Sequence, residues 1–154
     1  MGKVLILGGY GNFGKRIALA LTKKSIPVII AGRSQEKAQY FVNCLPSSLV
    51  EIAIFDISKE LSHQLKSLSP TVVINTCGPF QNSNYDAAKI CIEQGVHYID
   101  LADGRDFVVG ISALDTKAKE KNVAVISGAS TVPALSSAVI EHYRHEFSEQ
   151  VTGF

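Results

Sequence analysis

Three glycines follow the first apolar segment of the chain at a spacing that could hold phosphate groups. Residues 4–7 are apolar throughout. After them, Gly9, Gly11 and Gly14 fit the pattern G-x-G-x-x-G. In that pattern the first glycine permits a tight turn with positive φ, the second lets a pyrophosphate approach the backbone, and the third lets a helix pack closely. We therefore expect a dinucleotide site, with a purely structural glycine turn as the alternative.

The residues between the glycines, and a basic residue further on, narrow the class of ligand. The backbone amides of Tyr10, Asn12 and Phe13 are predicted to point at the phosphates, at the positive end of a helix dipole. About 20 residues after the last glycine, Arg33 occupies the position where NAD-binding proteins carry an acid. An arginine there suits a 2′-phosphate, so we expect NADP as the cofactor, with NAD as the alternative.

Two further segment ends carry groups that could bind the same cofactor. Next to Arg33, the Ser34 hydroxyl could bond to the 2′-phosphate, and Lys37 lies one helical turn further on. The alternative is that these two basic residues are only solvated and that Ser34 only caps a helix. Asp56 could accept a hydrogen bond from the adenine amine, with Ile57 against the ring, or Asp56 could assist the cap of the next helix.

The fourth apolar segment ends in Asn-Thr-Cys-Gly-Pro. We expect Cys77, Gly78 and Pro79 to lie along the pyrophosphate and the nicotinamide ribose. A cysteine in a cleft could also be a nucleophile, but no histidine stands beside Cys77 in the sequence. A small side chain that lets the cofactor approach is the preferred interpretation.

Charged and hydroxyl residues follow the last two apolar segments. Asp100, Asp103 and Arg105 could orient a substrate or carry a proton, or they could form an ion-paired loop in which Asp103 caps a helix. His97 stands at the start of its segment and is expected to face away from the site. The hydroxyls in residues 127–133 could contact the nicotinamide amide or cap the last helix.

These loops need a scaffold, and the alternation of the chain predicts one. Segments of helical periodicity separate six short apolar runs. In three of these segments the apolar residues recur at helical spacing: Phe13, Ile17 and Leu21; Phe107, Ile111, Leu114 and Ala118; and Leu135, Val139, Tyr143 and Phe147. The alternation predicts an α/β fold, a Rossmann-like doubly wound parallel sheet of about six strands with helices on both faces, in one domain over residues 1–154. The runs are residues 4–7, 28–30, 52–55, 72–74, 96–99 and 123–126.

Composition excludes several classes of protein. The 154 residues carry a formal net charge of +1, which gives no basic field for nucleic acid. The three cysteines are an odd number without metal-binding spacing, so we expect free thiols, a reducing cytoplasmic setting and no metal. No apolar run approaches membrane-spanning length, so we expect no membrane contact.

Three stretches of the chain resemble the NADP-binding domain of the saccharopine dehydrogenase family. They are GGYGNFG at residues 8–14, CGPF at 77–80 together with GVHYIDL at 95–101, and SGASTVP at 127–133. The resemblance implies an NAD(P)-dependent oxidoreductase that acts on a secondary amine or imine. It also implies a C-terminal domain, absent from this chain, that binds the small-molecule substrate. The sequence does not decide whether the full-length protein forms a homodimer.

One departure leaves the reaction open. The family often has Thr-Gly-Glu after the Asp-Leu pair, whereas this chain has Ala102, Asp103 and Gly104. Because the chain contains no catalytic constellation, a non-catalytic domain that senses NADP is an alternative, and an enoyl-type reductase on the same scaffold is another. The sequence assigns no catalytic residue.

Overall fold

Six parallel strands form a single sheet in the order β3-β2-β1-β4-β5-β6. This computed structural model describes residues 2–45, 48–80 and 84–146. The strand order reverses between β1 and β4, which is the arrangement of a doubly wound sheet and confirms the expected Rossmann-like fold. The strands are β1 (Val4–Leu7), β2 (Val28–Gly32), β3 (Val50–Ile54), β4 (Val72–Asn75), β5 (His97–Asp100) and β6 (Val125–Ile126).

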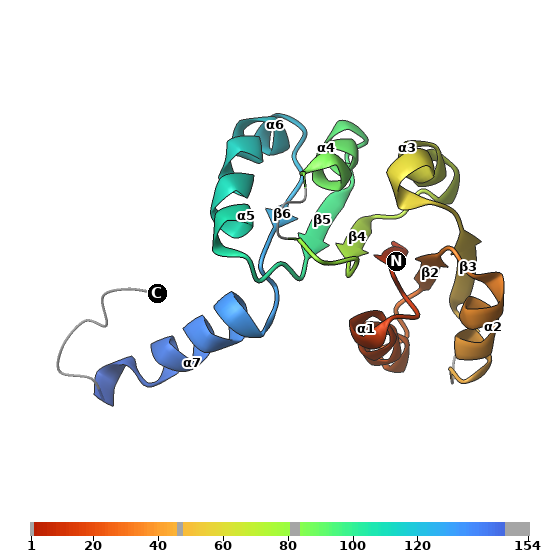
Figure 1. Cartoon of the computed structure of the whole chain (residues 1–154), viewed down its shortest axis with the longest axis horizontal. Helices are drawn as coiled ribbons and strands as arrows, with labels where there is room; N and C mark the ends of the chain where they lie inside the picture. Colours follow the sequence, from red (N-terminus) through yellow and green to blue (C-terminus); the bar gives the residue numbers. More distant parts are fainter. Residues whose placement is uncertain (1, 46–47, 81–83, 147–154) are drawn as a thin grey trace.

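Helices follow the strands and cover the sheet unevenly (Figure 1). Helices α1 and α2 lie on one face, over the β1–β3 half. Helices α3, α4 and α6 lie on the other face. Helix α7 extends away from the sheet. The bounds are α1 (Asn12–Lys23), α2 (Gln35–Asn43), α3 (Ile57–Leu68), α4 (Asp86–Glu93), α5 (Arg105–Gly110), α6 (Asp115–Glu120) and α7 (Ser136–His142), with 3₁₀ turns at Ile111–Leu114 and Arg144–Glu146 and an irregular helical turn at Thr131–Leu135.

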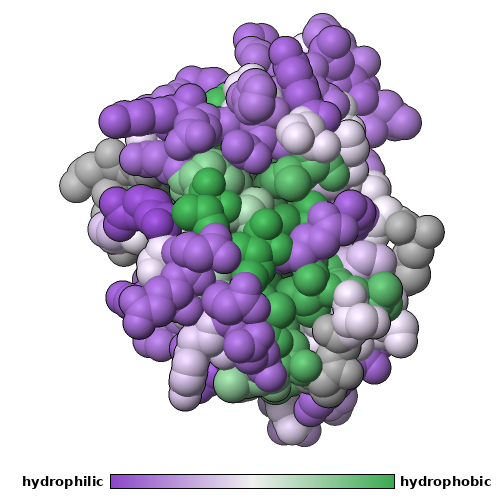
Figure 2. All heavy atoms as spheres, turned by 90° about the vertical axis from the view of Figure 1, so that its right-hand side faces the viewer, coloured by the Kyte–Doolittle hydropathy of each residue, from purple (hydrophilic) through white to green (hydrophobic). Residues whose placement is uncertain are grey.

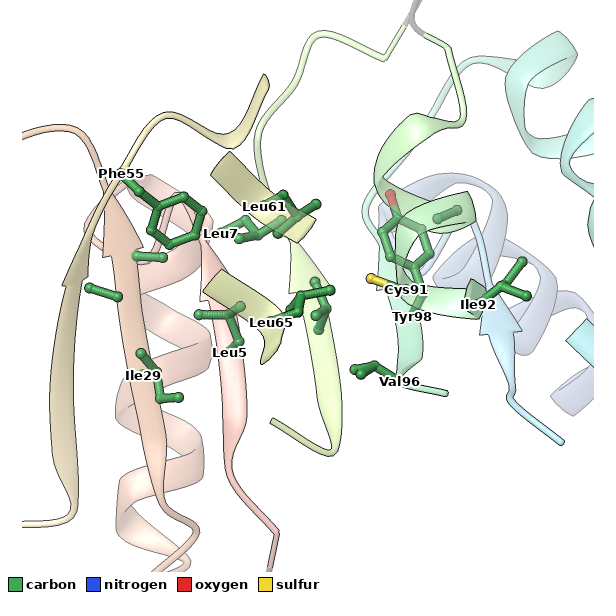
Figure 3. Close-up of a cluster of buried hydrophobic side chains, with 14 of the residues drawn as sticks. Leu5, Leu7, Ile29, Phe55, Leu61, Leu65, Cys91, Ile92, Val96 and Tyr98 are labelled. Carbon is green, nitrogen blue, oxygen red and sulfur yellow. The ribbon is translucent and has the colours of Figure 1, made fainter. Parts of the chain in front are cut away.

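The larger core lies between the sheet and helices α3 and α4 (Figure 3). Leu61 and Leu65 of α3 pack over Leu5 and Leu7 of β1, and all four side chains are buried. Strands of a parallel sheet are apolar throughout when both faces are covered, which explains the apolar runs of the sequence. Burial of a leucine of this size contributes about 1.5–3 kcal/mol, so this cluster fixes the strands whose ends border the site.

Helix α1 packs Ile17 and Leu21 of the predicted face against the core, but not Phe13. Its buried residues are Gly14, Ala18 and Thr22, whereas Phe13 is 57% exposed. The reason is Gly14, because a Cβ at that position would overlap the carbonyl oxygen of Gly8. The helix therefore contacts the turn through its glycine, and the aromatic ring beside it faces outward.

The segment over residues 107–118 buries the predicted face, although it is divided into α5, a 3₁₀ turn and α6. Phe107, Leu114 and Ala118 are buried. The last helix forms as predicted, but Leu135 and Val139 are 58% and 48% exposed, and α7 buries none of its residues. Phe147, the last member of that series, lies outside the described residues.

Strand β3 forms one edge of the sheet, and its outer side is apolar. Figure 2 shows this side of the molecule, where apolar residues gather in a band between hydrophilic ones. Ile54 of β3 and Leu49 beside it are exposed large apolar residues. In the described part of the chain, no helix is long and apolar enough to cross a membrane.

Candidate dinucleotide site at the carboxyl ends of the strands

One cavity of about 880 Å³ lies where the strands end. Five of the residues predicted from the sequence line it, contributed by the loops after four different strands. Because the carboxyl ends of parallel strands meet at one edge of a sheet, residues distant in sequence are brought together there. The five are Tyr10, Arg33, Asp56, Ile57 and Cys77.

The glycine turn after β1 has the expected shape with one correction. Gly8, not Gly9, has the positive φ of 74°. Gly9 is a glycine for a different reason, since a Cβ there would lie 2.9 Å from Ile30 Cγ2 and 3.1 Å from the carbonyl oxygen of Ile6. Gly14 has the predicted role, because it lets the start of α1 touch the turn. The sequence pattern alone does not show which of two adjacent glycines takes the left-handed conformation.

In the part of the chain that the structure describes, the amides predicted to face phosphates lack protein acceptors, but of their three residues only Tyr10 lines the cavity, whereas Asn12 and Phe13 line a second one of about 410 Å³. The Gly8 and Gly9 amides donate to the carbonyl oxygen of Ala31, both at 3.0 Å. By contrast, among the described residues no protein group accepts from the backbone amides of the three residues predicted for this role, and Gly11 caps α1 without a side-chain bond. Unpaired amides at a helix N-terminus form an anion site. The three residues are Tyr10, Asn12 and Phe13.

The loop after β2 places Arg33 at the cavity and leaves Ser34 and Lys37 outside its lining. Arg33 is exposed and lines the cavity. Ser34 is the N-cap of α2, and its Oγ accepts from the Lys37 amide at 3.3 Å. The Lys37 side chain is exposed and does not line the cavity. The structure therefore brings Arg33 to the site and shows the capping role of Ser34.

The loop after β3 uses Asp56 as the N-cap of α3. Asp56 Oδ1 accepts from the Ser58 amide at 3.0 Å and from Ser58 Oγ at 2.7 Å. The bond from the Ser58 hydroxyl, then that from its amide, lowers the pKa of this exposed carboxyl, which is therefore ionised near neutral pH. Asp56 and Ile57 both line the cavity beside Ser58. The capping role is confirmed, and the adenine contact stays a prediction.

The loop after β4 is held by Asn75 at the end of the strand. Asn75 Oδ1 accepts from the Cys77 amide at 3.0 Å, and its Nδ2 donates to Tyr98 Oη at 3.0 Å. Partial burial raises the pKa of the Cys77 thiol, and the charge of Arg33 offsets only part of that rise. The thiol is therefore protonated at neutral pH, which disfavours a nucleophilic role. The peptide bond between Gly78 and Pro79 is cis, and these two residues do not line the cavity.

Aromatic rings border the cavity on the side of α5. Phe80 and Phe107 line it with ring centroids 5.5 Å apart. Tyr85 lies against Phe107 with centroids at 4.6 Å, and its hydroxyl donates to the Phe107 carbonyl oxygen at 2.9 Å. Phe80 and Phe107, supported by Tyr85, therefore give the cavity an aromatic wall.

Asp100, predicted near a substrate, instead holds two loops together. Its side chain is fully buried and does not line the cavity. Its Oδ1 accepts from the amides of Ala102 and Gly128, both at 3.1 Å, and from Ser127 Oγ at 2.8 Å. These bonds link the GVHYIDL and SGASTVP stretches. His97 faces away from the cavity as expected, and its Nδ1 accepts from the Ala124 amide at 2.9 Å.

Several lining residues were not found from the sequence. Gly8 and Gly32 adjoin predicted residues, so the turn itself was the signal. Asn75 ends an otherwise apolar strand, and that polar residue was a usable signal. The residues of α4 carried none, because only the fold brings this helix to the cavity. The remaining unpredicted lining residues include Tyr98, Phe80, Phe107, Asp86, Lys89 and Glu93.

Relatives of this chain share its sequence over most of its length. A family model for the saccharopine dehydrogenase NADP binding domain matches residues 4–140. The saccharopine dehydrogenase-like oxidoreductase of Rattus norvegicus is 34% identical over 120 residues, which cover 71% of this chain and 28% of that protein. The protein of the same name from Homo sapiens is 32% identical over 150 residues, which cover 85% and 35%. The chain spans about a third of the length of these relatives.

Solved structures share the fold at low sequence identity. A short-chain dehydrogenase/reductase from Vibrio parahaemolyticus has a TM-score of 0.66 at 15% identity, covering 90% of this chain and 91% of that one. Yeast methylglyoxal/isovaleraldehyde reductase Gre2, complexed with NADPH, has a TM-score of 0.53 at 20% identity, covering 64% and 36%. This chain has a doubly wound sheet and a glycine turn, and the family model matches residues 4–140. It therefore belongs to the saccharopine dehydrogenase NADP-binding domain family.

Proposed function

We propose that this chain binds NADP(H) at the cavity and serves as the cofactor domain of an oxidoreductase. One observation carries the proposal: a single cavity joins the glycine turn, Arg33 and the end of β4 across the point where the strand order reverses. In open α/β sheets this is where dinucleotides bind. Membership of an NADP-binding domain family supports the same cofactor.

The residues present fit the proposed cofactor. The cavity volume of about 880 Å³ lies within the range of ligand sites. The unpaired amides of Tyr10, Asn12 and Phe13 would hold the pyrophosphate. Arg33 would hold the 2′-phosphate, because a guanidinium matches phosphate geometry and stays charged. Among the described residues, none forms an ion pair with Arg33, so the charge of its guanidinium is available to a ligand.

The rest of the cavity would receive the two bases. Asp56 and Ile57 would take the adenine, and the Cys77–Pro79 stretch would lie along the nicotinamide ribose. The protonated Cys77 thiol would act as a small neutral group and not as a nucleophile. When bound, the nicotinamide supplies hydride chemistry. The aromatic wall of Phe80 and Phe107 would exclude water from that end of the cavity.

We further propose a C–N substrate, an amine or imine, for the longer protein. The proposal rests on family membership and on the oxidoreductase names of the relatives. The chain spans about a third of those relatives, so substrate-binding residues would come largely from the remaining length. Oxidation of a secondary amine with reduction of NADP⁺, followed at 340 nm in such a longer protein, tests the substrate class. Turnover of enoyl substrates alone would contradict it.

Calorimetric titration of this chain with NADPH and with NADH tests the cofactor. We expect NADPH to bind at least tenfold more tightly, which corresponds to about 1.4 kcal/mol. Equal affinities would refute the assignment of Arg33 to a 2′-phosphate. Absence of binding by either dinucleotide would refute the cofactor site itself.

A further inference from the structure

The side chain of Tyr10 connects the glycine turn to the loop after β2. Its Oη accepts a hydrogen bond from the Ser34 amide at 2.8 Å, across 24 positions of the sequence. Its ring lies over Gly32, where a Cβ would overlap the ring. Tyr10 and Gly32 both line the cavity together with Arg33. The tyrosine hydroxyl is therefore fixed next to the residues that would meet a 2′-phosphate.

This bond changes which group of the loop can reach a ligand. The Ser34 amide is not free to meet an anion, because the hydroxyl of Tyr10 accepts from it. Ser34 Oγ accepts from the Lys37 amide. The hydroxyl proton of Tyr10 has no acceptor among the residues that the structure describes. The hydroxyl is thus a donor at the cavity without a protein partner, and the bond it accepts strengthens it as a donor.

We propose that the Tyr10 hydroxyl donates directly to the 2′-phosphate and is a determinant of the preference for NADP. This inference rests on the proposed cofactor and adds a residue whose role is specific to one phosphate. Arg33 supplies charge, and its side chain is exposed. Tyr10 supplies a neutral donor held in place by the Ser34 amide and by Gly32. A pre-positioned donor loses little conformational entropy when the ligand binds.

The test uses two nucleotides that differ by the 2′-phosphate. The chain and its Tyr10→Phe variant are titrated calorimetrically with 2′,5′-ADP and with 5′-AMP. Phenylalanine keeps the ring over Gly32, removes the hydroxyl and leaves the Ser34 amide without its acceptor. We expect the affinity for 2′,5′-ADP to fall about tenfold, as for loss of a hydrogen bond to a charged group, and the affinity for 5′-AMP to stay within about twofold. Tyr40→Phe is the matched control, because Tyr40 lies on α2 and is 73% exposed.

Each other outcome overturns the inference. Equal losses for both nucleotides would show that Tyr10 only supports the loop. An unchanged affinity for 2′,5′-ADP would show that its hydroxyl does not touch the phosphate. If the unsubstituted chain prefers 2′,5′-ADP to 5′-AMP and Tyr10→Phe keeps the same ratio of the two affinities, only this inference fails. If the unsubstituted chain binds neither nucleotide, the proposed cofactor site fails with it.

Discussion

Every strand of the sheet carries an isoleucine in register on one face, but the two halves of the sheet bury these side chains to different extents. On the face of α1 and α2, a row of isoleucines in register crosses all six strands. In the β1–β2 part these side chains are fully buried, whereas at β6 the side chain is 50% exposed. The row is Ile52, Ile30, Ile6, Ile74, Ile99 and Ile126. An apolar row therefore predicts a sheet face and does not show whether a helix covers it.

The loops of the two halves differ in whether their hydrogen-bond donors have partners within the protein. After β1, backbone amides such as those of Asn12 and Phe13 lack a protein acceptor in the described part of the chain. After β5 and β6, the donors of Ala102, Ser127 and Gly128 all bond to Asp100. The first half thus leaves its donors available to a ligand, and the second half uses its donors to hold its own loops. The groups proposed to bind phosphate therefore lie in the half that is better packed.

The largest effect is expected from shortening the buried isoleucine of β1. Ile6→Ala should lower the free energy of unfolding by about 2–5 kcal/mol, because it opens a cavity in a fully buried position. The matched variant Ile126→Ala removes the same atoms at the half-exposed end of the row. It should cost less than about 1 kcal/mol. Urea unfolding followed by circular dichroism measures both. Equal losses in the free energy of unfolding would show that Ile126 is as well buried as Ile6, which would contradict the comparison.

The next effect concerns the anchored loops of the second half. Asp100→Ala should lower the free energy of unfolding by about 2–4 kcal/mol, because it leaves buried backbone amides such as that of Gly128 without an acceptor. Asp100→Asn keeps an acceptor oxygen and should recover part of that loss. The same unfolding measurement decides. If alanine and asparagine variants are both as stable as the parent, the link between the two loops contributes nothing.

Much of this contrast could be predicted from the sequence, and some of it could not. The strand runs fell within two residues of the observed strands, because buried parallel strands are apolar and short. Arg33 was placed at the site because its distance from Gly14 is fixed by one β-α-β unit. The role of Asp100 was not predictable, since a carboxylate after a strand serves a ligand or a neighbouring loop with the same local sequence. The exposure of Ile126 depends on tertiary cover, which periodicity does not report.

The third prediction concerns the affinity of the better packed half for NADPH. Arg33→Ala should weaken NADPH binding by about tenfold, or about 1.4 kcal/mol, and leave NADH binding within about twofold. Arg144→Ala is the control from the other half, where Arg144 pairs with Glu141 at 3.3 Å. Calorimetry of both variants gives the affinities. Equal weakening of NADPH and NADH would remove the specific role of Arg33.

The smallest effect is a change of stability with pH at the start of α3. The pKa of Asp56 is lowered below its ordinary value of 3.8, so its capping contribution is present above that value and is lost as the pH falls through the lower folded-state pKa. Asp56→Asn keeps a capping side chain without the ionisation. Its stability should therefore decline less than that of the parent below about pH 4. Parallel acid titrations followed by circular dichroism would reveal the difference, and superimposable curves would contradict it.

We propose that the cofactor binds in the half whose backbone donors are unpaired. A titration of the ¹⁵N-labelled chain with NADP⁺, followed by amide resonances, tests this directly. We expect the amides of Tyr10, Asn12, Phe13 and Ser34 to shift on binding, while those of α7 do not. Shifts confined to β6 and α7, with the glycine turn unaffected, would contradict it.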